Sequence, residues 1–219
     1  MTTLGIIGAG NIGSQLARLG VASGYDVVVS NSRGPATLEG LVAELGPRAR
    51  AALPAEAATA GDLVVVTIPL HQIHTLPLAE LAGKTVIDTN NYYPQRDGDI
   101  VALDEETTTT AELLQDLVPD AKVVKAFNHI YAADLTTDGL PAGTEDRRAL
   151  VIAGNDPDAR ATVTALLDDF GFDTVDLGPL NEGWRIQRGT PGYGPRLAEF
   201  ELREAVSAAI RYRDMPEAV

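Results

Sequence analysis

The sequence predicts an α/β fold with a doubly wound, mainly parallel sheet. Three observations support this prediction. Short runs of β-branched residues alternate with longer amphipathic segments along the 219-residue chain. Several of the short runs are almost entirely apolar, as expected for strands that are covered on both faces. A glycine-rich turn stands between the first short run and the first amphipathic segment.

Hydrophobic spacing and helix stop signals justify the early elements in chain order. The run LGII predicts a strand, and the helix after it ends before Gly24. The run YDVVVS predicts the second strand, and the next helix lies between Pro35 and Gly46. A weaker strand, a short helix and the apolar run DLVVVTI follow. The predicted elements are strands Leu4–Ile7, Tyr25–Ser30, Ala49–Ala52 and Asp62–Ile68, and helices Ser14–Ala22, Thr37–Leu45 and Pro54–Ala60.

The later elements repeat the strand-helix-strand pattern. The runs TVID and KVVKAF flank one helix, and the runs ALVIA and DTVDL flank another. Glycine and proline are frequent in Pro179–Pro195, which predicts a loop. The predicted elements are strands Thr85–Asp88, Lys122–Phe127, Ala149–Ala153 and Asp173–Leu177, and helices Thr110–Leu117, Pro157–Phe170 and Leu197–Tyr212.

Composition limits the possible classes of protein. The chain is 45% hydrophobic, has a formal net charge of −14 and contains no cysteine. The missing cysteines exclude a disulfide framework, a thiolate metal site and a cysteine nucleophile. The acidic balance disfavours nucleic acid and anionic membranes as partners. The longest apolar stretch, Leu63–Leu70, is far shorter than the roughly 20 residues of a spanning helix, and no signal segment opens the chain, so we expect a soluble, cytoplasmic protein.

The glycine-rich turn has the spacing G-x-G-x-x-G and predicts a dinucleotide site of the Rossmann type. The turn needs Gly8, a pyrophosphate can approach Gly10 closely, and Gly13 lets the helix pack on the strand. Asn11 and Ile12 lie where the helix begins, and unpaired N–H groups at such a point attract an anion.

The end of the second strand favours NADP(H) over NAD(H). An NAD site usually carries an acid there, which binds the ribose 2′-hydroxyl. No acid occurs from Val27 to Ala36, and Asn31, Ser32 and Arg33 follow the strand instead. A guanidinium suits the 2′-phosphate of NADP(H).

Other candidate residues follow the neighbouring strands, because ligands bind at the carboxyl ends of a parallel sheet. Around the nicotinamide and its acceptor we expect Thr67, Ile68, Pro69, Asn90, Asn128 and His129. Simpler interpretations stay open: Pro69 can start a helix, Asn90 can form a turn, and His129 can be a buried structural side chain. His71 and His74 have no further ligand nearby, so no metal site is predicted. No convincing general acid or base is present, which favours direct hydride transfer between two cofactors.

Six segments resemble one family. They are GIIGAGNIGSQLA, SNSRGP, VVVTIPL, VVKAFN, VIAGND and DLGPL, and in this order they resemble the coenzyme F420-dependent NADP oxidoreductases. The cytosolic reductase domain of membrane ferric reductases is also similar. The chain departs from deazaflavin-linked members at Asn128–Tyr131, where they often have His-Thr-Ile-Pro, and in the tail Asn181–Arg196. These departures leave the electron acceptor open.

The resemblance implies an NADP-binding Rossmann domain at residues 1–128 and a smaller part at residues 129–219 that extends the sheet and closes the acceptor cleft. It further implies hydride transfer between NADP(H) and coenzyme F420, and a homodimer. The alternatives are a reductase of a free flavin or another small acceptor, on which Trp184, Tyr193 or Tyr131 can stack, and a non-catalytic NADPH sensor. Coenzyme F420 is anionic and therefore needs a local basic lip. The candidates for this lip are Arg147 with Arg148, or Arg185, Arg188 and Arg196.

Overall fold

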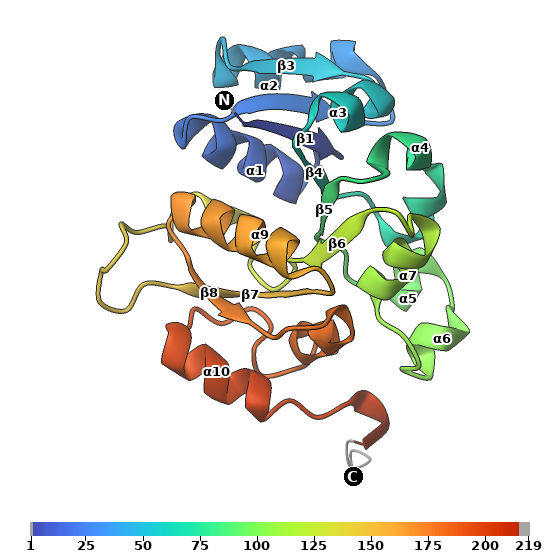
Figure 1. Cartoon of the computed structure of the whole chain (residues 1–219), viewed down its shortest axis with the longest axis vertical. Helices are drawn as coiled ribbons and strands as arrows, with labels where there is room; N and C mark the ends of the chain where they lie inside the picture. The colour runs from blue at the N-terminus through green and yellow to red at the C-terminus, as the bar shows by residue number, and fades with distance from the viewer. Residues whose placement is uncertain (1, 215–219) are drawn as a thin grey trace.

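The computed structural model of the chain describes residues 2–214. One sheet of eight strands runs through it in the order β3-β2-β1-β4-β5-β6-β7-β8 (Figure 1). The strands are β1 (Thr3–Ile7), β2 (Asp26–Ser30), β3 (Ala49–Ala52), β4 (Leu63–Val66), β5 (Thr85–Asp88), β6 (Lys122–Lys125), β7 (Ala149–Gly154) and β8 (Asp173–Asp176). Neighbouring strands are parallel except β6 and β7, which are antiparallel. The predicted doubly wound, mainly parallel sheet is confirmed.

Helices cover both faces of the sheet. The α-helices are α1 (Asn11–Ala22), α2 (Glu39–Leu45), α3 (Pro54–Ala60), α4 (Leu78–Leu81), α5 (Pro94–Asp97), α6 (Val101–Asp104), α7 (Thr110–Leu117), α8 (Ala132–Leu135), α9 (Pro157–Asp169) and α10 (Glu199–Ser207). Short 3-10 helices are η1 (Pro35–Leu38), η2 (Leu70–Thr75), η3 (Leu180–Ile186) and η4 (Tyr212–Asp214).

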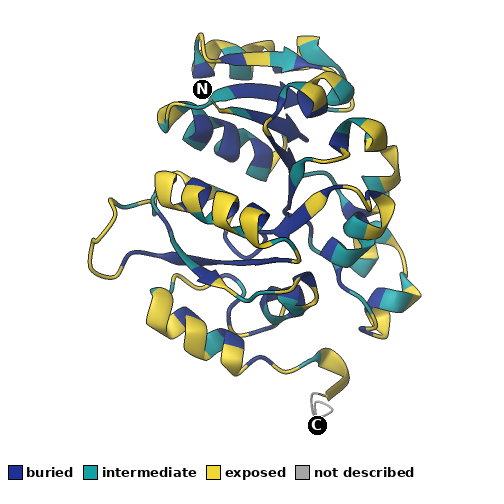
Figure 2. Cartoon of the chain, in the orientation of Figure 1, coloured by how far each residue is buried: buried dark blue, intermediate teal, exposed yellow. Residues whose placement is uncertain are grey.

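Two apolar clusters lie on opposite faces of the sheet, because side chains alternate along each strand. Val65 of β4 packs in a cluster with Leu16 of α1 and Val163 of α9. Val64, one position earlier, packs with Leu114 of α7 in the other cluster. The inner strands are therefore almost entirely buried, the edge strands β3 and β8 are partly exposed, and the helices keep an exposed outer face (Figure 2). Truncation of one such core leucine to alanine costs about 2–5 kcal/mol.

The order of the strands locates the candidate site. From β1 the chain proceeds to β2 and β3 on one side of the sheet, and it then returns to build β4, β5 and β6 on the other side. The reversal falls between β1 and β4. Ligands of open α/β sheets bind at such a reversal, outside the carboxyl ends of the strands. The sheet also continues beyond Asn128, since β7 and β8 form its last two strands.

Several predicted element bounds were too wide. β4 ends at Val66 and β6 at Lys125, because the chain turns away from the sheet at its carboxyl edge. The final helix is Glu199–Ser207 rather than Leu197–Tyr212. The predicted loop Pro179–Pro195 contains η3, whose residues Trp184 and Ile186 are buried.

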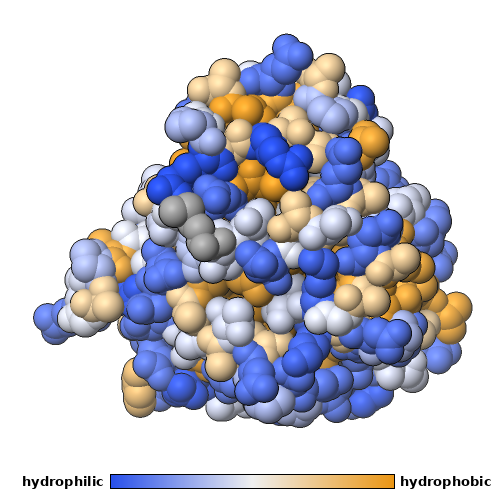
Figure 3. All heavy atoms as spheres, turned by 45° about the horizontal axis from the view of Figure 1, so that its top comes forward, coloured by the Kyte–Doolittle hydropathy of each residue, from blue (hydrophilic) through white to orange (hydrophobic). Residues whose placement is uncertain are grey.

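The exterior has mixed polarity. The face shown in Figure 3 is a mosaic of hydrophilic residues and small apolar patches. Within residues 2–214, no helix combines the length and the apolar character that a membrane crossing requires.

Candidate functional site

The glycine-rich turn joins β1 to α1 and is held by main-chain bonds. The N–H groups of Gly8 and Ala9 both donate to the carbonyl of Ser30, at 2.9 and 3.0 Å. The hydroxyl of Thr67 donates to the carbonyl of Gly8 at 2.7 Å. Gly8 has φ +109°, and a Cβ there would lie 2.5 Å from the Thr67 carbonyl oxygen. Thr67 therefore stabilises the turn through its contacts with Gly8.

The other two glycines of the motif have different surroundings. A Cβ on Gly13 would lie 1.9 Å from the carbonyl oxygen of Gly8, so this position tolerates no side chain. A Cβ on Gly10 would meet nothing within 4 Å. Gly10 is the N-cap of α1, where no side chain caps the helix and no acid lies in the first turn. The helix therefore begins at Asn11 and Ile12 with its N–H groups free for an anion.

The loop after β2 presents a cation beside this turn. The side chain of Asn31 accepts from the main-chain N–H of Arg33 at 2.9 Å and donates to the hydroxyl of Thr37 at 2.9 Å, which fixes the loop. Ser32 and Arg33 are exposed. Within residues 2–214 the guanidinium of Arg33 has no hydrogen bond or ion pair.

A cavity of about 220 Å³ lies between the glycine-rich turn, this loop and η2. It is lined by Ile7, Gly8, Ala9, Gly10, Asn31, Ser32, Arg33, Pro54, Ile68, Gln72, Thr75 and Leu76. The structure thus brings together Gly8, Gly10, the predicted loop and Ile68, while Gly13 and Pro69 do not line this cavity. Sequence reasoning missed Gln72 and Thr75, because the apolar spacing of the segment gave no clear helix. Pro69 is the N-cap of η2.

A buried ion pair fixes the turn after β5. The ammonium of Lys125 lies 2.9 Å from the carboxylate of Asp88 and donates to the carbonyl of Asn90 and the hydroxyl of Thr110. The other oxygen of Asp88 accepts from the N–H of Asn90 at 3.0 Å. Burial lowers the pKa of Lys125, and the charge of Asp88 opposes this effect. The main-chain N–H and the carbonyl of Asn90 are therefore both hydrogen-bonded. Its side-chain Nδ2 is buried without a partner in residues 2–214.

Asn128 connects the carboxyl edge of the sheet to the C-terminal part. Its Nδ2 donates to Oδ1 of Asn91 at 3.1 Å and to the carbonyl of Ile186 at 2.9 Å. Asn91 returns a bond from its Nδ2 to the Asn128 carbonyl at 2.7 Å. Asn128 is 5% exposed. Its position between β6 and η3 makes it part of the wall of a second cavity.

His129 has a structural environment. Its ring is buried, with Nδ1 3.1 Å from the carbonyl of Gly192, while Nε2 accepts from the N–H of Val151 at 2.9 Å. Burial lowers its pKa to about 4. The ring is therefore neutral at pH 7, and both nitrogens are already bonded to the main chain.

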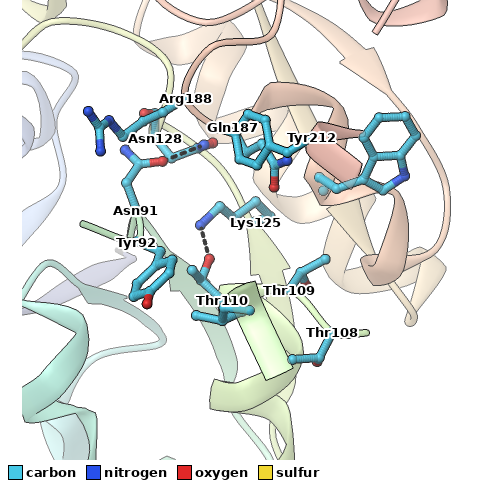
Figure 4. A pocket seen from close by; sticks show the side chains of 13 residues that line it. Asn91, Tyr92, Thr108, Thr109, Thr110, Lys125, Asn128, Gln187, Arg188 and Tyr212 are labelled. Atoms are coloured by element: carbon cyan, nitrogen blue, oxygen red, sulfur yellow. Dashed lines mark hydrogen bonds between the residues drawn. The ribbon is translucent and has the colours of Figure 1, made fainter. Parts of the chain in front are cut away.

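The second cavity, of about 60 Å³, lies between β6, the start of α7 and η3 (Figure 4). Its lining combines the apolar side chains of Leu103 and Trp184 with polar ones, which include Asn91, Thr108, Thr109, Thr110, Lys125, Asn128, Gln187, Arg188 and Tyr212. Sequence reasoning did not assign Lys125 or the threonines a role. A signal for Lys125 exists in the sequence, since a lysine between apolar residues of a buried strand needs a carboxylate partner.

The arginines predicted to form a basic lip have different environments in the structure. Arg147 and Arg148 are 3% and 1% exposed, and each forms ion pairs with two aspartates, so they are not part of a lip. Arg185 pairs with Glu182, and Arg196 donates to the carbonyl of Asp146. Arg188 lies at the second cavity.

The three aromatic candidates also differ in access. Trp184 is buried between the guanidiniums of Arg185 and Arg211, at 4.5 and 4.6 Å from its ring centre. Tyr193 is partly buried, and its hydroxyl lies 3.1 Å from that of Tyr93. Tyr131 is 63% exposed. An incoming planar ring can therefore reach Tyr131 and Tyr193 but not Trp184.

Comparisons with known proteins agree with this geometry. A family model described as "NADP oxidoreductase coenzyme F420-dependent" matches residues 3–92. The chain is 33% identical over 187 residues to metalloreductase STEAP3 of Rattus norvegicus, a match of 84% of this chain and 35% of that protein. It is 28% identical over 165 residues to the F420-dependent NADP reductase of Methanocaldococcus jannaschii, over 67% of this chain and 72% of the relative.

A solved structure is similar along most of its length. The crystal structure of a putative F420-dependent NADP reductase from an Arthrobacter species superimposes with a TM-score of 0.69 at 29% identity, covering 82% of this chain and 85% of that one. The chain spans about a third of the length of the metalloreductases that it matches. The family model covers residues 3–92, which include the glycine-rich turn, and these relatives and this solved structure extend the similarity to coenzyme F420-dependent NADP oxidoreductases along most of the chain.

Proposed function

We propose that the chain binds NADP(H) in the cavity beside the glycine-rich turn and transfers hydride between it and coenzyme F420. The single observation that carries the proposal is the combination of an uncapped α1 N-terminus with the guanidinium of Arg33, which has no partner within residues 2–214. These are two separate anion sites on one cavity. NADP(H) has two anionic groups to match, the pyrophosphate and the 2′-phosphate.

The residues present fit this cofactor. The open space at Gly10 lets a pyrophosphate approach the N–H groups of Asn11 and Ile12. Ser32 and Arg33 extend from a loop that has no acid from Val27 to Ala36, so a 2′-phosphate meets no repulsion from the loop itself. Ile68 lines the same cavity, and we place Ile68 and Pro69 against the nicotinamide.

The chain binds, orients and shields the reacting groups. Bound NADP(H) would supply the hydride chemistry, and solvent would supply the proton that balances it. His129 is neutral and fully bonded, and Lys125 is engaged with Asp88, so neither side chain is available to exchange a proton with a substrate. Positioning of the reacting groups therefore accounts for the rate in this mechanism. We assign closure of the acceptor cleft to residues 129–219.

The F420-dependent NADP reductase of Methanocaldococcus jannaschii supports a deazaflavin as the acceptor. A free flavin is the second candidate acceptor. The rings of Tyr131 and Tyr193 can stack on a flavin as well as on a deazaflavin, because both are planar tricycles. The similarity to metalloreductases supports a third possibility, in which the electrons finally reach a metal ion.

The test is anaerobic oxidation of NADPH by the purified protein, with coenzyme F420 and FMN side by side and NADH as the cofactor control. Fast turnover of NADPH with coenzyme F420, and little with NADH, supports the proposal. Turnover of NADPH with FMN but not with coenzyme F420 would identify a flavin as the acceptor. Tight binding of NADPH without turnover of any acceptor contradicts an enzymatic role and favours a sensor.

A further inference from the structure

Arg188 holds an uncompensated charge at the edge of the second cavity. Its guanidinium lies 4.4 Å from the ring centre of Tyr93 and has no hydrogen bond or ion pair within residues 2–214. Its charge also lowers the pKa of the Tyr193 and Tyr212 phenols against the stronger, raising effect of their burial. Arg188 therefore lies among three phenols, in a chain whose formal net charge is −14.

The neighbouring charges are already neutralised or bonded. Lys125, in the wall of the same cavity, pairs with Asp88. Arg96 stacks on Tyr93 as well, at 4.7 Å, and pairs with Asp97. The buried carboxylate of Glu106 accepts from Gln187 at 2.7 Å and from the N–H of Arg213 at 2.9 Å. A negatively charged ligand at this edge thus finds Arg188 as its available cation.

The size of the cavity limits which part of an acceptor can enter. About 60 Å³ is room for roughly four water molecules, enough for a phosphate group and too little for a fused three-ring system. Asn91 and Asn128 line it beside Arg188, and Oδ1 of Asn128 is buried without a partner in the described chain. The ring of an acceptor must therefore stay outside, where Tyr131 and Tyr193 are accessible.

We propose that Arg188 determines specificity by binding the phosphate of a phosphate-bearing planar acceptor, whose ring lies outside the cavity. This inference rests on the proposed function, because it concerns the acceptor of the same reaction. A guanidinium offers several donors in one plane, which suits a phosphate. The stacking on Tyr93 holds the guanidinium in place before the ligand arrives.

The experiment compares FMN with riboflavin, which differ by one phosphate. Arg188→Met keeps the aliphatic stem and removes the charge, and Arg185→Met is the matched control, because Arg185 already pairs with Glu182. We expect Arg188→Met to raise the KM for FMN about tenfold and to leave those for riboflavin and NADPH within twofold. Arg185→Met should change none of them. Inorganic phosphate should compete with FMN in the wild type and not in Arg188→Met.

Flavin binding, followed by the quenching of flavin fluorescence, gives a second measurement that needs no turnover. If NADPH is not oxidised with any acceptor but FMN binds more tightly than riboflavin in an Arg188-dependent way, the proposed function fails and this inference stands. If turnover occurs but Arg188→Met affects FMN and riboflavin equally, the inference is wrong and the proposed function stands. Equal effects of the two arginine variants, or no difference in binding between FMN and riboflavin in the wild type, also overturn it.

Discussion

The ammonium of Lys125 and the carboxylate of Asp88 lie 2.9 Å apart in the interior, at 3% and 0% side-chain exposure. Removal of one partner leaves a buried charge uncompensated. We therefore expect Lys125→Met to lower the free energy of unfolding by about 3–5 kcal/mol in urea denaturation. The double variant Lys125→Met with Asp88→Leu should recover much of this loss. A double variant as unstable as the single one would show that the bonds of Lys125 to Asn90 and Thr110, and not the ion pair, cause the effect.

The glycines of the turn allow a matched pair of substitutions. Gly13→Ala places a methyl group 1.9 Å from the carbonyl oxygen of Gly8, so we expect a loss of more than about 2 kcal/mol in unfolding free energy. Gly10→Ala adds the same methyl group to open space and should cost less than about 1 kcal/mol. NADPH affinity should nevertheless fall about tenfold or more in Gly10→Ala, because the methyl group occupies the approach of the pyrophosphate. Thermal unfolding and NADPH titration separate the two effects. Unchanged NADPH affinity in Gly10→Ala would show that the pyrophosphate does not bind at this turn.

The strand segments of the sheet were predictable because buried parallel strands have a strong local signature. The run from Leu63 to Val66 is apolar at every position, and burial on both faces demands this. The ends of the strands were less predictable. Thr67 and Ile68 are as suitable for a strand as the residues before them, and β4 ends only because the chain turns toward η2. The short helices α5, α6 and α8 were also missed, since four residues carry too little periodicity to be recognised.

The candidate site was predictable where spacing alone determines geometry. The glycine-rich turn and the loop at Arg33 have fixed places in a strand-turn-helix unit, and both line one cavity. The roles of arginines depend instead on partners that are distant in sequence. Arg148 reaches Asp134 and Asp138, and Arg147 reaches Asp168 and Asp173, so these two arginines are structural rather than a lip. No local pattern distinguishes them from Arg188.

Arg33 should determine cofactor preference. In the described part of the chain the guanidinium has no partner to lose, so Arg33→Ala should leave the unfolding free energy within about 0.5 kcal/mol of wild type. Loss of a charge-assisted bond to the 2′-phosphate should weaken NADPH binding about ten- to a hundredfold and leave NADH binding almost unchanged. Titration of both dinucleotides, with exposed Arg203→Ala as the control, measures the difference. An equal loss for NADPH and NADH would contradict this role of Arg33.

His129 should make stability depend on pH in a defined window. Its pKa is about 4 in the folded chain, where burial opposes the charged ring, against a usual value of 6.5. Between these values the unfolded chain binds a proton that the folded chain does not, so the free energy of unfolding falls as pH falls. The contribution is complete above pH 6.5 and decreases by about 1.4 kcal/mol per pH unit below it, until the folded ring also titrates near pH 4.

Urea denaturation at pH 7.0 and 5.5 should show this loss in the wild type and in the control His74→Gln, whose histidine is exposed. His129→Gln should be less stable at pH 7.0 but should lose about 1 kcal/mol less on acidification. The same slope in all three proteins would mean that the ring of His129 is protonated or solvated in the folded chain.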